Sequence, residues 1–186
     1  YQQSLEEKVE QRTKELNIKN EELFKLSITD KLTGLYNRVK LDSVLQENMS
    51  LSLRYGNIFS IIIIDIDFFK KINDNFGHQV GDDVLKECSY ILSQNIRNVD
   101  TLGRWGGEEF LVVCPETLKN GAKDLAIKLN KAIKLHKFTT YPHSVTISVG
   151  VASCSVNDLN YDDIISNADK ALYEAKNNGR DRVEIF

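Results

Sequence analysis

The sequence is poor in cysteine and proline, with three Cys and two Pro in 186 residues. Cys88, Cys114 and Cys154 are odd in number, widely spaced and without a CxxC pair, which argues against a disulfide framework or a zinc site. We expect three buried free thiols in a reducing cytoplasm.

Long apolar runs and an excess of positive charge are also missing. The longest apolar run, Ile61–Ile64, is far too short to span a bilayer and predicts a buried strand. Net charge is −3, from 24 Lys and Arg against 27 Asp and Glu, which argues against a nucleic-acid partner. The apolar fraction of 41% is ordinary for a soluble globular protein of one domain plus an appendage.

Residues 1–28 contain no Gly or Pro and predict one long helix. Its a and d heptad positions are mostly apolar, with Arg12 and Lys19 at the two polar d positions, which indicates a short, imperfect coiled-coil seam. The alternative is a solvated linker helix that packs on its own domain. The apolar seam positions are Leu5, Val9, Leu16, Leu23 and Leu26.

Residues 29–186 predict an α+β domain in which a central hairpin is flanked by crossover helices, as in ferredoxin-like, split-βαβ sheets. A helix should follow Asn37 and run to about Leu53. The other expected helices are 67–76, 80–95, 119–136 and 162–177, and the expected strands are 57–66, 101–105, 109–114, 145–152 and 182–186.

Two acidic pairs suggest a metal site. Asp65 and Asp67 end the apolar strand and point to the same side, where burial is costly unless a cation such as Mg²⁺ compensates. The pair Glu108-Glu109 follows Gly106-Gly107, which permit positive φ and close approach of a phosphate. If this hairpin pairs beside the apolar strand, its turn lies next to Asp65. Taken alone, Glu108-Glu109 favours a solvated acidic turn, and only its neighbours in the sequence favour a metal site.

Further residues suit a nucleotide. Lys70, Lys176 and Arg180 lie at loop mouths and could bind phosphates, although each alone reads as a surface charge. No GxxxxGK[ST] or GxGxxG motif is present. Asp82 could accept hydrogen bonds from the guanine edge with help from Asn73, or it could be a charge at a helix N-terminus.

At this point the sequence closely resembles the GGDEF domain of diguanylate cyclases over residues 29–186. Five motifs in the family's order carry the resemblance. They are Thr29-Asp30-Lys31-Leu32-Thr33-Gly34-Leu35-Tyr36-Asn37-Arg38, Asp65-Ile66-Asp67-Phe68-Phe69-Lys70-Lys71-Ile72-Asn73-Asp74, Phe76-Gly77-His78 with Gly81-Asp82, Gly106-Gly107-Glu108-Glu109-Phe110, and Ala168-Asp169-Lys170-Ala171-Leu172-Tyr173 with Ala175-Lys176 and Gly179-Arg180. Glu108 replaces the Asp of the family's name motif, an accepted active variant.

The resemblance implies an enzyme that condenses two GTP into cyclic di-GMP and two pyrophosphates, on a sheet similar to the palm of class III cyclases. It implies two Mg²⁺ or Mn²⁺ ions per site, bound by Asp65, the carbonyl of Ile66, Glu108 and Glu109. Glu108, Glu109 and Lys70 would be the catalytic residues. The implied GTP contacts are Asn73, Asp82, His78, Phe69, Lys176, Arg180, Gly106 and Gly107.

The resemblance also implies a regulated homodimer, since each domain binds one GTP. The RxxD sequence Arg97-Asn98-Val99-Asp100 ends shortly before Gly106, as in the family's product-inhibition site. Because the chain begins with Tyr1, we expect a cytoplasmic segment of a bacterial protein whose N-terminal part carries a sensor and could attach to a membrane. The alternatives are a domain that only binds GTP or cyclic di-GMP, and a dimerisation module.

Overall fold

The computed structural model describes residues 2–155 and 158–186, with side chains from residue 8 onward. Every expected element is present, with ends within two residues of those expected. The helices are α1 Gln2–Ile28, α2 Arg38–Tyr55, α3 Phe69–Phe76, α4 His78–Asn95, α5 Lys119–Leu135 and α6 Tyr161–Asn177. The strands are β1 Phe59–Ile66, β2 Thr101–Gly106, β3 Glu109–Pro115, β4 Ile147–Ser153 and β5 Val183–Ile185.

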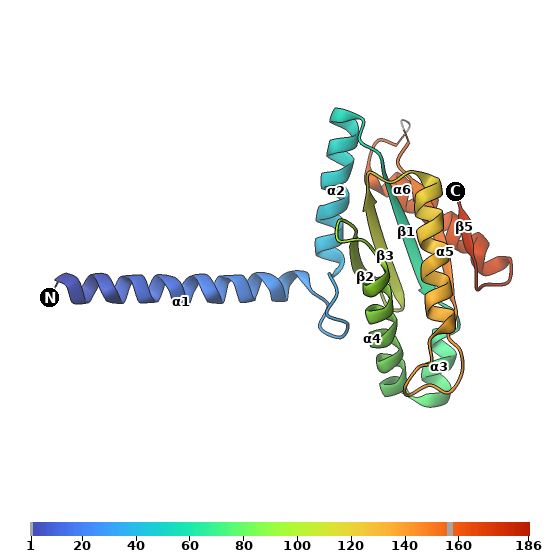
Figure 1. Cartoon of the computed structure of the whole chain (residues 1–186), viewed down its shortest axis with the longest axis horizontal. Helices are drawn as coiled ribbons and strands as arrows, with labels where there is room; N and C mark the ends of the chain where they lie inside the picture. The colour runs from blue at the N-terminus through green and yellow to red at the C-terminus, as the bar shows by residue number, and fades with distance from the viewer. Residues whose placement is uncertain (1, 156–157) are drawn as a thin grey trace.

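The strands form one five-stranded sheet in the order β2-β3-β1-β4-β5 (Figure 1). β3 is antiparallel to both β1 and β2, so β1 and β2 run parallel with β3 between them. β4 is antiparallel to β1, and β5 adds in parallel to β4. This is the expected split-βαβ arrangement, extended by one edge strand.

The central strand β1 is buried along its whole length and separates two apolar clusters. Ile62 and Ile64 face α3, α4 and α5, whereas Ile61 and Ile63 face α2 and α6. A strand covered on both faces reads as a continuous apolar run, which explains its sequence. Any polar residue at its end is therefore held in fixed surroundings.

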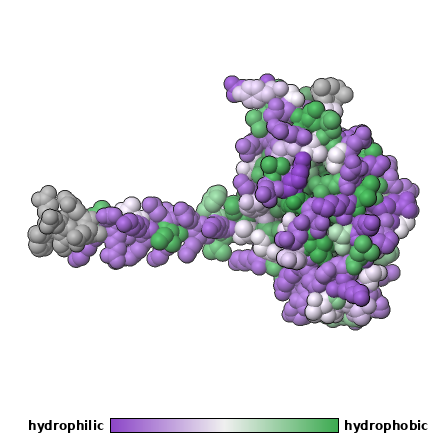
Figure 2. Space-filling model, viewed as in Figure 1, coloured by the Kyte–Doolittle hydropathy of each residue, from purple (hydrophilic) through white to green (hydrophobic). Residues whose placement is uncertain are grey.

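Helix α1 projects away from the domain (Figure 1). Seam residues Val9, Leu16, Leu23 and Leu26 are 59%, 59%, 63% and 60% exposed, so a helix packed along its own domain is the wrong alternative for them. Figure 2 shows separate hydrophobic patches on an otherwise hydrophilic α1. The side chain of Leu5, the fifth seam position, lies outside the described residues. Among the described helices, none is both long and apolar enough to cross a membrane.

All three cysteines are free thiols, as expected. Cys88 and Cys114 are buried, but the expectation of burial is wrong for Cys154, which is partly exposed. Cys154 lies just beyond the end of β4, where its Sγ is 3.2 Å from the hydroxyl of Ser52. Because β4 ends at Ser153, Cys154 lies outside the buried part of the sheet.

Candidate active site

The carboxyl end of β1 and the β2–β3 turn lie side by side, as the sequence predicted. In the antiparallel register of β1 and β3, Asp65 lies directly opposite Glu109. The backbone N–H of Ile66 donates to the carbonyl of Glu108 at 3.4 Å. The second acidic pair is thus next to the first, because one ladder of the sheet fixes both.

The two aspartates at the end of β1 differ in their surroundings. Asp67 is 5% exposed and accepts hydrogen bonds from the hydroxyls of Thr146 and Ser148, at 2.7 and 2.6 Å, and from the backbone N–H of Asp181 at 3.0 Å. The expectation that a metal ion would compensate both aspartates is therefore wrong for Asp67, whose charge is stabilised by protein donors. Asp65 remains the candidate ligand.

The carboxylate of Asp65 lies 2.8 Å from Nζ of Lys176, which comes from the end of α6. Burial raises the pKa of Asp65 above its ordinary value, and the nearby Glu108 and Asp67 raise it further, while Lys176 acts in the opposite direction. The net direction is upward, so one lysine does not compensate the negative charge at this point.

The same holds for Glu109, whose carboxyl pKa is raised by burial first and then by Asp65, Asp169 and Glu108, against the attraction of Lys176. Acidic groups that raise one another's pKa are held together at a cost in free energy, which an added cation relieves.

The residues present fit a divalent cation bound together with a phosphate. Among the described residues, no three His, Cys, Asp or Glu side chains are gathered closely enough to form a complete metal cage. Mg²⁺ requires no such cage, because it is commonly bound by one or two carboxylates plus substrate phosphates. Asp65, the carbonyl of Ile66 and Glu108 supply hard oxygen donors of that kind.

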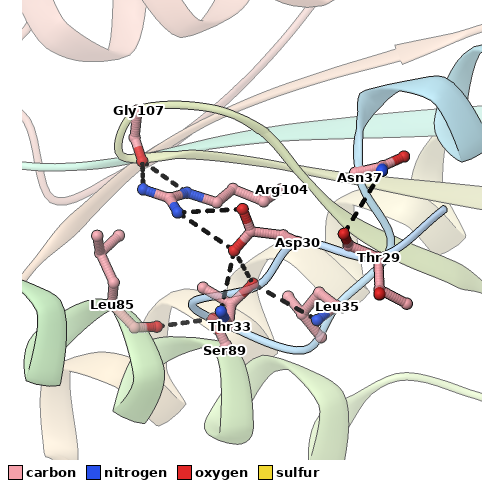
Figure 3. A network of polar contacts seen from close by, with 9 residues as sticks. All are labelled: Thr29, Asp30, Thr33, Leu35, Asn37, Leu85, Ser89, Arg104 and Gly107. Atoms are coloured by element: carbon pink, nitrogen blue, oxygen red, sulfur yellow. Dashed lines mark hydrogen bonds and ion pairs between the residues drawn. The ribbon is translucent and has the colours of Figure 1, made fainter. Parts of the chain in front are cut away.

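The β2–β3 turn is held by an arginine that the sequence reasoning missed. Arg104 donates from Nε and Nη2 to the carbonyl of Gly107, at 2.9 and 2.7 Å, and from Nη1 to the carboxylate of Asp30, at 3.2 and 3.3 Å (Figure 3). Gly106 and Gly107 do not use the positive φ that glycine permits, since neither lies in that region. A Cβ on Gly107 would meet no heavy atom within 4 Å, and one on Gly106 would meet only Oε2 of Glu109, at 3.7 Å, so the turn is open to the close approach of a phosphate.

The loop that carries Asp30 is also bonded to the end of α1, through Asn37. Asp30 also accepts hydrogen bonds from the backbone N–H and the hydroxyl of Thr33 at 2.9 and 2.7 Å. Close by, the amide of Asn37 donates to the carbonyl of Ser27 at 2.8 Å. The same amide donates to the carbonyl of Thr29 at 3.5 Å (Figure 3). The segment that joins α1 to the domain is therefore tied to the turn that carries Glu108. Asp30 and Arg104 both sit in or beside motifs visible in the sequence, but their partnership depends on the fold.

The candidate guanine site lies between α3 and α4. A Cβ built on Gly81 would lie 1.9 Å from Oδ1 of Asn73 and 3.3 Å from Cζ of Phe69, so the amide and the ring edge meet over this glycine. Asp82 follows in the second turn of α4, which begins at His78. The reading of Asp82 as a charge in the first helical turn is therefore wrong, while His78 is exposed at the helix start.

The candidate phosphate cations come from two elements. Lys176 and Arg180 lie at the end of α6 and just beyond it, and Lys70 is exposed in the first turn of α3. The guanidinium of Arg180 lies 4.6 Å from the ring centre of Phe68, the residue that precedes α3. Arg180 is thus held beside the helix that carries Lys70.

The RxxD residues lie elsewhere, at the opposite end of β2 from the turn. Arg97 makes a two-pronged ion pair with the buried Asp100, at 2.7 and 3.1 Å, and donates to the hydroxyl of Thr117 at 2.6 Å. The Arg97 side chain remains 53% exposed, so a guanidinium of fixed orientation faces solvent.

Gly81→Ala should separate nucleotide binding from stability. The new Cβ would displace Asn73, a flexible side chain that can swing away, so the free energy of unfolding should change by less than about 1 kcal/mol. We expect the KM for GTP to rise about tenfold, equivalent to loss of one good hydrogen bond. Steady-state kinetics and thermal melts measure both, with Gly121→Ala in α5 as a matched glycine control. An unchanged KM would contradict the placement of Asn73.

Glu109→Gln should stabilise the metal-free protein near neutral pH. A raised pKa means that ionisation of Glu109 costs folded-state free energy, a cost absent at acidic pH and present once pH exceeds the raised pKa. We expect a gain of roughly 0.5 kcal/mol at pH 7, after allowing for screening of a half-buried group, and none at pH 4. Urea unfolding in EDTA at both pH values measures it, with exposed Glu47→Gln as control; a loss at pH 7 would refute the assigned repulsion.

The chain is similar to known proteins in sequence and in fold. The family described as "Diguanylate cyclase, GGDEF domain" matches residues 27–182. Diguanylate cyclase A of Treponema denticola is 39% identical over 174 residues, which are 90% of this chain and 47% of that protein. The chain thus spans less than half of the length of that curated relative.

Two solved structures show the same fold. The coiled coil and GGDEF domain of DgcB from Caulobacter crescentus, in complex with c-di-GMP, has a TM-score of 0.89 at 27% identity, covering 98% of this chain and 100% of that one. The active GGEEF domain of a diguanylate cyclase from Vibrio cholerae has a TM-score of 0.77 at 37% identity, covering 81% of this chain and 96% of that one.

Proposed function

This chain belongs to the GGDEF-domain family of diguanylate cyclases, and on that basis we propose that it condenses two GTP molecules into cyclic di-GMP and two pyrophosphates. The observation that carries the proposal is the β1–β3 register, which sets Asp65 opposite Glu109 with Lys176 paired to the aspartate. That arrangement joins acidic ligands and a phosphate-binding cation at one sheet end. The Vibrio relative described as active has the same Glu in its name motif.

Each residue then has a role in binding or orienting GTP. Asn73 and Asp82 bind the guanine edge, with Phe69 and His78 beside it. Lys70, Lys176 and Arg180 bind the triphosphate, which can approach the Gly106-Gly107 turn closely. Asp65, Glu108, Glu109 and the carbonyl of Ile66 would hold two Mg²⁺ or Mn²⁺ ions, which supply charge neutralisation for displacement at phosphorus. Glu108 also accepts the proton of the attacking 3′-hydroxyl.

The reaction needs two chains, because one domain holds one GTP. Each 3′-hydroxyl attacks the α-phosphate of the other nucleotide, forming one phosphodiester bond and releasing one pyrophosphate. We propose that 1–28 pairs with its counterpart as a coiled coil and that 29–186 is the catalytic domain. The exposed seam of α1 supports this, and the solved Caulobacter relative is described as containing a coiled coil. A sensor domain in the full-length protein is part of the same proposal, supported by the greater length of the curated relative.

The deciding experiment is incubation of the dimeric chain with GTP and Mg²⁺, followed by chromatography of the products. Cyclic di-GMP and two equivalents of pyrophosphate are the expected result. A verified dimer that binds GTP and yields no product would refute the enzyme and favour a nucleotide sensor. A dimer that binds neither GTP nor cyclic di-GMP would favour a dimerisation module.

Arg97→Ala should relieve product inhibition. Arg97 offers its exposed guanidinium to a phosphate while Asp100 fixes its orientation, and the Caulobacter relative was solved with c-di-GMP. We expect the inhibitory concentration of cyclic di-GMP to rise at least about tenfold, as for loss of a charge-assisted contact, with uninhibited turnover unchanged. Initial rates at increasing cyclic di-GMP measure this, with exposed Lys131→Ala as control. Unchanged inhibition would remove Arg97 from the regulatory site.

A further inference from the structure

We propose that Asp67 is a positioning residue for the triphosphate of GTP. It anchors the bend that follows α6 and carries Arg180, and it does so as a hydrogen-bond acceptor and not as a metal ligand. The inference rests on the proposed function, because it assigns a role in binding the same substrate.

Asp67 joins three segments that are distant in sequence. Its Oδ1 accepts from Ser148 in β4 and its Oδ2 from Thr146, which immediately precedes β4, and Oδ2 also accepts the backbone N–H of Asp181. Its own backbone N–H donates to the carbonyl of Thr146 at 2.9 Å. Both carboxylate oxygens are therefore engaged by protein donors in a nearly fully buried position.

The bend held by Asp67 has an unfavourable backbone. Arg180 and Asp181 have φ of 64° and 47°, a region that residues with side chains rarely adopt. The backbone N–H of Arg180 donates to the carbonyl of Ala175 at 3.0 Å, while that of Asp181 donates to Asp67. Such a conformation persists only where its surroundings fix it, and Asp67 supplies the contact immediately after Arg180.

The bend also determines where the arginine lies. The guanidinium of Arg180 is over the ring of Phe68, the residue next to Asp67, and Nη1 donates to the carbonyl of Lys176 at 3.4 Å. One turn of chain earlier, Lys176 pairs with Asp65. The aspartates at and just beyond the end of β1 thus contact the segment that carries both cations. Asp65 pairs with the side chain of Lys176, and Asp67 accepts the backbone N–H beside Arg180.

The test compares Asp67→Ala, Asp67→Asn and Asp65→Asn. An asparagine can keep its carbonyl on the backbone N–H of Asp181 while its amide donates to the Ser148 hydroxyl, so it preserves the bend without the charge. Alanine preserves neither. Binding is measured by calorimetry in the presence of Mg²⁺ with 3′-deoxy-GTP, a nucleotide that cannot react because it lacks the 3′-hydroxyl. Turnover of GTP is measured separately.

We expect Asp67→Ala to weaken binding of 3′-deoxy-GTP about tenfold, equivalent to about 1.4 kcal/mol, with cyclic di-GMP binding at Arg97 unchanged. Asp67→Asn should bind within about threefold of the natural protein and keep its Mg²⁺ dependence, whereas Asp65→Asn should lose that dependence. In the Arg180→Ala background, Asp67→Ala should add little further loss, since both act through one guanidinium. Should Asp67→Ala fail to fold, Thr146→Val removes one of the hydroxyls that hold the carboxylate and should weaken binding about threefold.

If Asp67→Asn loses Mg²⁺-dependent binding, as Asp65→Asn is expected to do, then Asp67 is a metal ligand and the inference is overturned. Fully additive losses with Arg180→Ala would also overturn it. A natural protein that binds 3′-deoxy-GTP but makes no product from GTP would instead refute the proposed function, while the binding comparison would still decide the role of Asp67.

Discussion

Glu108→Gln should reduce cyclic di-GMP formation at least about a hundredfold, the size of loss seen when one preorganised charge-stabilising group is removed from an active site. The substitution keeps shape and removes the negative charge that faces Asp65 and Glu109. Since Glu108 lies in a turn and is partly exposed, folding should be nearly unaffected. The rate of product formation, measured by chromatography under saturating GTP and Mg²⁺, gives the effect.

Glu47→Gln is the matched control, since it makes the same chemical change at an exposed position of α2. Both variants should unfold at the same temperature as the natural protein. Both should also bind cyclic di-GMP at Arg97 with unchanged affinity. A Glu108→Gln protein with full turnover would show that the metal and proton-accepting roles assigned to Glu108 are wrong.

Disruption of the α1 seam should make activity strongly dependent on protein concentration. Leu16→Glu combined with Leu23→Glu places charges at two apolar seam positions, which should raise the dimer dissociation constant at least about a hundredfold. At protein concentrations below that constant, turnover per chain should fall by a similar factor. It should recover as concentration rises, because each domain remains intact.

The matched control is Ile18→Glu combined with Phe24→Glu. These residues are 58% and 61% exposed, close to the 59% and 63% of Leu16 and Leu23, but they lie off the seam. Sedimentation and rate measurements over a dilution series should separate the pairs. Equal effects of both would show that general hydrophobicity of α1, and not a seam, drives association.

Strands β1 and β3 were predictable because each carries an apolar run that matches its buried position in the sheet. The run Ile61–Ile64 is apolar at every position, as expected for a strand buried on both faces, and a hairpin paired beside this strand would bring its acidic turn to Asp65. The register of Asp65 opposite Glu109 confirms that the hairpin pairs there. The long helix α1 was likewise predictable, because residues 1–28 contain no Gly or Pro.

Other features depended on contacts between distant segments. Nothing near Asp67 in sequence shows that Thr146, Ser148 and Asp181 donate to it, so its acidity suggested a metal. The pairing of Arg104 with Asp30 is equally non-local, since the two residues are 74 positions apart in the sequence. At Gly106 and Gly107, the sequence alone could not show that neither residue adopts a positive φ.

The position of Arg97 has a kinetic consequence. Arg97 precedes the start of β2 and Glu108 follows its end, and six residues of strand separate them by about 17 Å or more. Cyclic di-GMP held at Arg97 would not occupy the space of the GTP bound to the same chain. Inhibition by the product should then lower the maximal rate without raising the KM for GTP. A higher GTP concentration would not overcome it, so the concentration of cyclic di-GMP itself would limit further synthesis.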